Sequence, residues 1–280
     1  MPRLILVCTL VSAAAVWAIV LFLCYAAMPL FFSGEFPRVV TGAWRPYGSP
    51  ADYGIAPMIV GSLLLALAAL AIAFPVALGV CGFAHGIAPR CLGKILLSVI
   101  HFMTSIPTVI YGFVSVWLLV PLVRNTLSAG TGFSLLTAAL TVSLLILPTI
   151  VLLIDVGFRQ IDSDIKLACH ALGLSPAQAQ LRVLFPMARR SLVAAAVLGF
   201  CRAVGDTLIA LMVAGNAPQI PSSPTESIRT LTSHIALVVA TDWYSPEYRS
   251  VAAAGLLLFL LSAGLSIMIR RFRLTPLEEW

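Results

Sequence analysis

The stretch from residue 191 to residue 213 is apolar except for a few residues, of which two are charged, Arg202 and Asp206. A charged side chain at the centre of a bilayer costs about 2.5 to 3.5 kcal/mol on insertion scales, so charges at that depth usually have a use. If the stretch is one helix, residues four apart share a face, and the two can form an ion pair that lowers this cost. They are the first candidates for function. The alternative is that they bridge neighbouring helices or a partner subunit.

The rest of the composition is that of a membrane protein. Of 280 residues, 60% are hydrophobic and 10% are charged, and the mean hydropathy is +1.04, whereas about 25% of a soluble chain is charged. About 20 apolar residues span a bilayer as a helix, and the strict alternation of a membrane barrel is missing. We therefore predict an all-α integral membrane fold with six transmembrane helices, over residues 4–32, 57–83, 95–122, 133–154, 191–213 and 251–269. Turns are expected at Pro75, Pro107 and Pro121.

The distribution of Lys and Arg predicts the orientation of these spans. With the N-terminus in the cytoplasm, eleven of the seventeen basic residues lie inside, five lie outside, and Arg202 is within a span. An excess of basic residues marks the cytoplasmic side, so both termini are expected there. The net charge of +6 is thus a topology signal, and no nucleic-acid partner is expected. The first apolar run is too long for a removable signal peptide.

Motifs for catalysis and metal binding are missing from the sequence. The four histidines are scattered, the six cysteines contain no CxxC pair, and no HExxH, GxSxG or P-loop motif occurs. We expect no metal and no cofactor on this chain, and ATP, if it is used, must bind to another chain. A membrane-embedded enzyme stays an alternative that needs a cluster of His, Asp or Glu facing one cavity.

The segment between the fourth and fifth spans, residues 157–190, predicts a helical hairpin. A short helix over residues 165–172 is followed by Gly173, which suits a left-handed helix end. Ser175 and Pro176 then suit the start of a second helix, and Pro186 marks the approach to the fifth span. By shape alone, this hairpin either lies on the membrane surface or docks on another protein.

Sequence motifs favour docking. The run Leu167-Ala-Cys-His-Ala-Leu-Gly173, followed by Val183-Leu-Phe-Pro186, resembles the EAA loop of ABC importer permeases. The match rests on Ala168, Gly173, Val183 and Pro186. Leu167 stands where the pattern has Glu, and Cys169 stands where it has Ala. In that family the loop is a cytoplasmic coupling helix that docks in a cleft of the ATPase subunit, so the resemblance implies this role for the hairpin.

Further motifs narrow the resemblance to the PstC-type permeases of phosphate ABC importers. They are Trp44-Arg-Pro46, Tyr53-Gly-Ile55, Ser105-Ile-Pro-Thr-Val-Ile-Tyr-Gly-Phe113, Leu147-Pro-Thr149 and Arg202-Ala-Val-Gly-Asp-Thr207, in which Asp206 replaces the family's Glu. The resemblance implies a type I, MetI-like fold. It divides the chain into an N-terminal helix and periplasmic loop (1–56), the transmembrane domain (57–271) and a cytoplasmic tail (272–280). The implied partners are an ATPase subunit, a PstA-type permease and a periplasmic phosphate-binding protein, although pairing with itself stays open.

The resemblance also gives the charged pair a hypothetical role. A guanidinium fork matches the oxygens of phosphate, so Arg202 could engage the anion in passing. Asp206 would hold Arg202 when the path is empty, and the hydroxyl of Thr207 would add a hydrogen bond. The same architecture could instead serve another oxyanion, such as sulfate, molybdate or a phosphonate. Two weaker expectations concern Ser105, Thr108 and Tyr111, which either line a path or satisfy backbone groups, and Asp155, expected at a solvated helix end.

Overall fold

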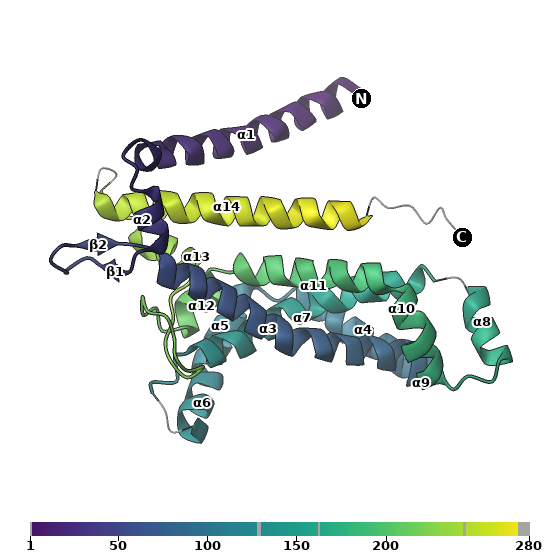
Figure 1. Cartoon of the computed structure of the whole chain (residues 1–280). Coiled ribbons are helices and arrows are strands. Elements are labelled where there is room, and N and C mark those ends of the chain that lie inside the picture. The colour runs from purple at the N-terminus through teal and green to yellow at the C-terminus, as the bar shows by residue number, and fades with distance from the viewer. Residues whose placement is uncertain (1, 128–129, 162, 243–244, 274–280) are drawn as a thin grey trace.

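The protein is a bundle of long helices that lie side by side, with short elements gathered at its two ends (Figure 1). The structure is a computed structural model that describes residues 2–127, 130–161, 163–242 and 245–273. Most of the predicted tail, residues 272–280, is therefore outside the described residues. We call the end that carries α8 (Ser163–Ala171) the hairpin end, and the end that carries α13 (Leu231–Val238) the loop end.

The first half of the chain contains the elements α1 (Pro2–Phe32), α2 (Phe36–Thr41), β1 (Trp44–Arg45), β2 (Asp52–Tyr53), α3 (Ala56–Gly82), the π-helical turn η1 (Phe83–Ile87), α4 (Arg90–Thr104), α5 (Thr108–Trp117) and α6 (Leu119–Leu127). The second half contains α7 (Leu135–Arg159), α8, α9 (Pro176–Ala179), the π-helical turn η2 (Gln180–Leu184), α10 (Phe185–Met187), α11 (Arg189–Val204), α12 (Leu208–Val213), α13 and α14 (Pro246–Arg273). The two strands pair as one antiparallel hairpin.

Five helical segments of the described chain are long and apolar enough to cross a membrane: Ile5–Phe32, Ala56–Ile87, Thr108–Leu127, Leu135–Arg159 and Glu247–Met268. A sixth span is obtained when the segment Pro176–Met187 and α11, bent by 73° relative to each other, are taken together. The prediction of an all-helical membrane protein is thus confirmed, with six as an approximate number of spans.

The third predicted span, residues 95–122, is wrong as a single helix. The chain leaves the helix at Ser105 and resumes it after Pro107, which separates α4 from α5. Proline has no N–H and disfavours helical geometry in the residue before it, so the expected turn at Pro107 is confirmed. A second interruption at Leu118 separates α5 from α6. Pro121 explains it, because its ring conflicts with the carbonyl four residues earlier, that of Trp117. Pro75 lies within α3, so the turn expected there is wrong.

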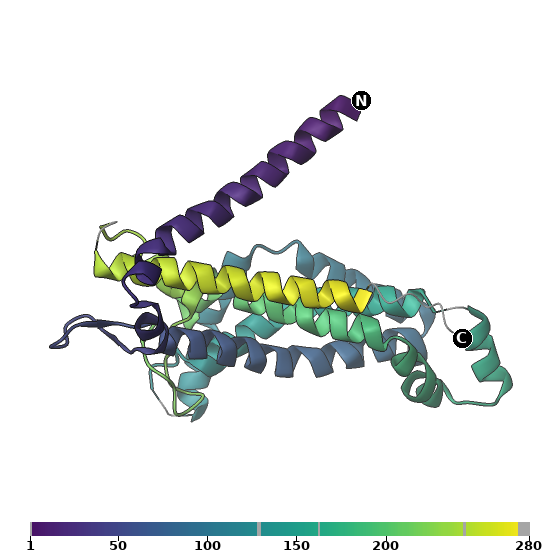
Figure 2. The same cartoon turned by 45° about the horizontal axis from the view of Figure 1, so that its top comes forward.

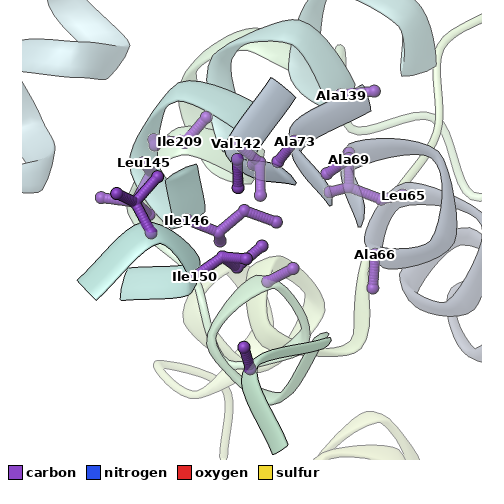
Figure 3. Packing of buried hydrophobic residues seen from close by; sticks show 14 of the residues in the cluster. Leu65, Ala66, Ala69, Ala73, Ala139, Val142, Leu145, Ile146, Ile150 and Ile209 are labelled. Atoms are coloured by element: carbon purple, nitrogen blue, oxygen red, sulfur yellow. The ribbon is translucent and has the colours of Figure 1, made fainter. Parts of the chain in front are cut away.

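The core is formed where α3, α7 and α11 pack together. Small residues on α3, among them Ala66, Ala69 and Ala73, are buried against the larger Ile146 and Ile150 of α7 (Figure 3). Small side chains let helix backbones approach closely in a membrane. Gly199 of α11 serves the same purpose, since a Cβ there would lie 2.8 Å from Ile150 Cδ1.

The first helix, α1, is attached to the bundle at only one end. Its last turns contact α14, with Ala27 and Leu30 buried, and an ion pair between Glu35 and Arg249 at 3.0 Å lies beside this contact. Figure 2 shows that the rest of α1 diverges from the bundle. Its apolar side chains are exposed in this chain and are available to lipid or to another subunit.

Candidate functional site

The fifth predicted span contains a break at the charged pair. The helix α11 ends at Val204, and α12 begins at Leu208, so residues 205–207 are not helical. A single helix over residues 191–213 is therefore wrong. The carboxylate of Asp206 explains how the chain restarts a helix: its Oδ2 accepts a hydrogen bond from the backbone N–H of Ile209 at 2.9 Å. This is the spacing of a helix cap, which satisfies one of the free N–H groups at a helix start.

The ion pair expected between Arg202 and Asp206 is not found among the described residues, where no ion pair or hydrogen bond involves the Arg202 side chain. The reason is the break, because the expected pairing assumed four residues on one continuous helix face. Asp206 lies beyond the helix end, and its side chain is buried, with the residue 9% exposed. Arg202, one turn earlier, is exposed. In the structure Asp206 therefore caps a helix, and the guanidinium of Arg202 has no ion-pair partner.

Thr207, the third predicted path residue, lies at the start of α12 and is partly buried. Its backbone carbonyl accepts a hydrogen bond from Leu211 at 2.9 Å. Within the described part of the chain its hydroxyl has no hydrogen-bond partner. Neither Thr207 nor Arg202 therefore has a side-chain hydrogen bond within the described residues.

The first turn of α13 and the loop that leads into it pack against this break. The hydroxyl of Thr232 in α13 donates to the backbone oxygen of Asp206 at 2.8 Å. Ser62 of α3 fixes the same turn by accepting from the N–H of Leu231 at 2.8 Å. The loop also carries Arg229, whose Nε donates to the backbone oxygen of Asn216 at 2.9 Å. Burial lowers the pKa of the Arg229 guanidinium. Sequence reasoning counted Arg229 only as an external basic residue, since nothing in its neighbourhood signals burial.

At the opposite end of the bundle, Asp155 forms a network that sequence reasoning missed. The residue is 4% exposed, so the expected solvated helix end is wrong. One carboxylate oxygen lies 2.6 Å from His85 Nε2, and the other accepts from Arg159 Nε at 2.9 Å. His85 belongs to η1, so the network ties α7 to the end of α3. A separation of 70 residues between His85 and Asp155 hides this contact from sequence patterns.

The predicted helical hairpin is present at the hairpin end (Figure 1). Gly173 has a φ of +73°, the left-handed conformation expected after α8. Ser175 and Gln178 then form a reciprocal capping box that starts α9. The first helix of the hairpin, α8, begins at Ser163, two residues before its predicted start at residue 165.

The residues of the EAA-like motif occupy different surroundings in this hairpin. Cys169 is buried and Val183 is half-buried, whereas Ala168 and Pro186 are exposed. Two large apolar side chains also stand in the open, since Leu167 is 65% and Leu172 is 78% exposed. The hairpin therefore presents exposed apolar side chains, as expected whether it lies on the membrane surface or docks on another protein.

Of the three polar residues near Pro107, Tyr111 takes the structural role that was one of the two expectations, and for Ser105 and Thr108 the choice between the two stays a prediction. Tyr111 donates its hydroxyl to the backbone oxygen of Met103 at 3.0 Å, a carbonyl close to the break between α4 and α5. Among the described residues, no group of three or more His, Cys, Asp or Glu side chains could hold a metal ion.

A bundle of five or six apolar spans, with a helix break beside Arg202 and a helical hairpin at one end, is the architecture of a multi-pass membrane protein. The family described as "Binding-protein-dependent transport system inner membrane component" matches residues 79–273, and the chain belongs to this family. It is therefore an ABC importer permease of the inner membrane, a transporter component that works with an ATPase and other subunits.

Individual relatives extend the match over most of the chain. It is 34% identical over 267 residues to the probable ABC transporter permease protein YqgH of Bacillus subtilis, covering 94% of this chain and 86% of that protein. It is 27% identical over 290 residues to the phosphate transport system permease protein PstC of Xylella fastidiosa, covering 93% and 88%. A chain of the MetNI methionine ABC transporter, in an inward-facing conformation, has the same fold, with a TM-score of 0.59 at 18% identity over 78% of this chain and 95% of that one.

Proposed function

We propose that the oxyanion carried by this permease is inorganic phosphate. The observation that carries the proposal is Arg202, a guanidinium beside a helix break that forms no ion pair or hydrogen bond among the described residues and interacts with Asp206 only at longer range. Relatives named as PstC phosphate permeases, at 26% to 27% identity, support the choice of anion. Phosphate carries one to two negative charges at neutral pH, and a planar guanidinium pairs with two of its oxygens at once.

The role of Asp206 in this proposal differs from the one the sequence suggested. Its carboxylate is engaged by the N–H of Ile209, so it shapes the break and leaves Arg202 unpaired. Arg202 is exposed in this chain, so an anion can reach it, and contact with a single guanidinium leaves the anion free to depart again. The free hydroxyl of Thr207 adds a neutral donor to the same passage. This arrangement favours transient contact over tight binding.

The partners follow from the same proposal. The exposed Leu167 and Leu172 suit a cleft in an ATPase subunit, which binds the ATP, so this chain itself holds no cofactor. A PstA-type permease completes the path, and a phosphate-binding protein delivers the anion at the loop end. In this orientation the hairpin end faces the cytoplasm, the loop end faces the periplasm, and both termini are cytoplasmic.

Reconstitution tests the choice of substrate. The chain is inserted into proteoliposomes with its ATPase and second permease, and radiolabelled phosphate is presented on the binding protein, with and without ATP. We expect ATP-dependent phosphate uptake that a large excess of sulfate, molybdate or phosphonate does not reduce. Uptake that sulfate outcompetes would assign the permease to another oxyanion.

A further inference from the structure

Arg229 holds a partly buried positive charge in the loop that packs against the helix break. The N–H of Ile228 donates to the backbone oxygen of Ala214 at 2.9 Å, and residues 215 and 228 form a parallel β-bridge, so the loop runs along the end of α12. Arg229 then donates through Nε to Asn216. A guanidinium has five N–H donors, and this contact uses one of them.

Two carboxylates are bound elsewhere: that of Glu226, the nearest to Arg229 in the sequence, and that of Asp206 at the break. The side chain of Glu226 accepts from the N–H of Ser222 at 2.8 Å and from its hydroxyl at 2.6 Å. The side chain of Asp206 is held by Ile209. In the described part of the chain, no carboxylate forms an ion pair with Arg229. By contrast, Arg249, also at the loop end, is paired with Glu35 at 3.0 Å.

An unpaired and partly buried cation is costly, so its retention calls for an anion that is absent from this chain. The position of Arg229 relative to the break suggests which anion. Thr232, three residues after Arg229, is bonded to Asp206, and Asp206 follows Arg202 by four residues. The two unpaired arginines therefore flank one break, Arg202 on the α11 side and Arg229 in the loop at the loop end.

We propose that Arg229 is a second oxyanion-binding residue, which meets the translocated anion on the loop-end side of the break before Arg202 does. The proposal rests on the proposed function, since it assumes that the cargo is an oxyanion. Two guanidinium groups in series let the anion exchange one partner for the next without crossing a region that lacks positive charge. Neither group then needs to bind it tightly.

The test uses the complete reconstituted importer and the variants Arg229→Gln and Arg229→Lys. Arg124→Gln is the control, because Arg124 is another arginine at the loop end with no ion-pair partner in the described residues, but it is exposed where Arg229 is partly buried. Uptake is measured against the concentration of loaded binding protein. A cation in the path affects the rate at saturation, kcat, whereas a residue that docks the binding protein or only shapes the loop changes KM.

We expect Arg229→Gln to lower kcat about 10- to 100-fold, the usual effect of losing one charged hydrogen-bond partner, with KM and protein level unchanged. Arg229→Lys should recover part of the rate, and Arg124→Gln should stay within about twofold of the wild type. An Arg229→Gln variant at normal level with wild-type kcat, or with a change in KM alone, overturns the proposal.

The two proposals fail in different ways. If the wild-type importer carries sulfate in place of phosphate, the proposed substrate is wrong, but Arg229→Gln should still lower kcat for sulfate by the same factor. If the wild type carries phosphate and Arg229→Gln carries it equally fast, the substrate stands and the second binding residue is wrong. Where Arg229→Gln does not assemble, Arg229→Lys decides, because a drop in its kcat at unchanged KM supports the proposal and wild-type kinetics contradict it.

Discussion

At the scale of single residues, the site depends on which partner each charged group finds. Asp206 binds the amide of Ile209 and leaves Arg202 without a carboxylate, whereas Asp155 binds both His85 and Arg159. A buried acid with neutral or cationic partners is satisfied, and an exposed arginine without one is available. The two acids are therefore held in structural contacts, and Arg202 is the charge in these spans that we propose for transport.

Substitutions at Asp206 separate its capping role from its charge. Asp206→Asn keeps a side-chain oxygen that accepts from Ile209, so we expect nearly wild-type stability. Asp206→Ala removes the cap and should cost about 1 kcal/mol, within the range of 0.5 to 2 kcal/mol for such losses. The free energy of unfolding in detergent, measured by denaturant titration, checks both. If Asn and Ala lose the same stability, the charge matters and the capping role is wrong.

The sequence could predict that Arg202 and Asp206 matter but not how they are arranged. The free energy needed to place a charged side chain in lipid makes such residues notable in any apolar stretch. The i, i+4 pairing is wrong because the helix stops before Asp206, and the backbone oxygen of Asp206 instead accepts from Thr232 of α13, a residue distant in the sequence. Arg229 could not be predicted as a site residue for the same reason, since its burial is produced by contacts with residues 214–216.

At the scale of elements, breaks within helices place polar groups inside the predicted membrane-spanning bundle. The breaks between α4 and α5 and between α11 and α12 release backbone groups that side chains satisfy, here Tyr111 and Asp206. Irregular backbone is tolerated within a membrane where it is buried in protein or lines a cavity. Proline identified the first break from the sequence. The second has no proline, and apolar periodicity alone could not distinguish it from a continuous span.

The turn of the α8–α9 hairpin depends on one glycine, whose substitution tests the backbone conformation of the turn alone. Gly173 has a φ of +73°, and a Cβ there would have no atom within 4 Å, so Gly173→Ala introduces backbone strain without a clash. We expect the hairpin to lose about 1 to 2 kcal/mol of local stability. Amide hydrogen exchange in α8 and α9 should become about 5- to 30-fold faster.

A matched glycine supplies the control. Gly264 lies in α14 and also has open space around its Cβ, but its φ is ordinary. Gly264→Ala should slow exchange in α14, because alanine favours a helix by about 1 kcal/mol over glycine. Unchanged exchange in the hairpin of Gly173→Ala would show that the left-handed turn is not what holds it.

At the scale of the whole molecule, composition and hydropathy were enough to predict a helical membrane protein, and the hairpin motif was enough to predict its class. How the chain assembles with other subunits could not be predicted from the sequence. The diverging α1, with most of its apolar side chains exposed, and the exposed leucines of the hairpin are surfaces whose partners are other chains. A single sequence records such surfaces only as apolar residues, which look the same whether lipid or protein covers them.

The central claim is that unpaired arginines at the break between α11 and α12 bind an oxyanion in passing. The most direct measurement is a crystal structure of the assembled importer with arsenate, located by the anomalous scattering of arsenic. We predict arsenate within hydrogen-bonding distance, about 3 Å, of the guanidinium of Arg202 or Arg229. Finding both guanidiniums paired with carboxylates of a neighbouring subunit, or turned toward lipid, would contradict the claim.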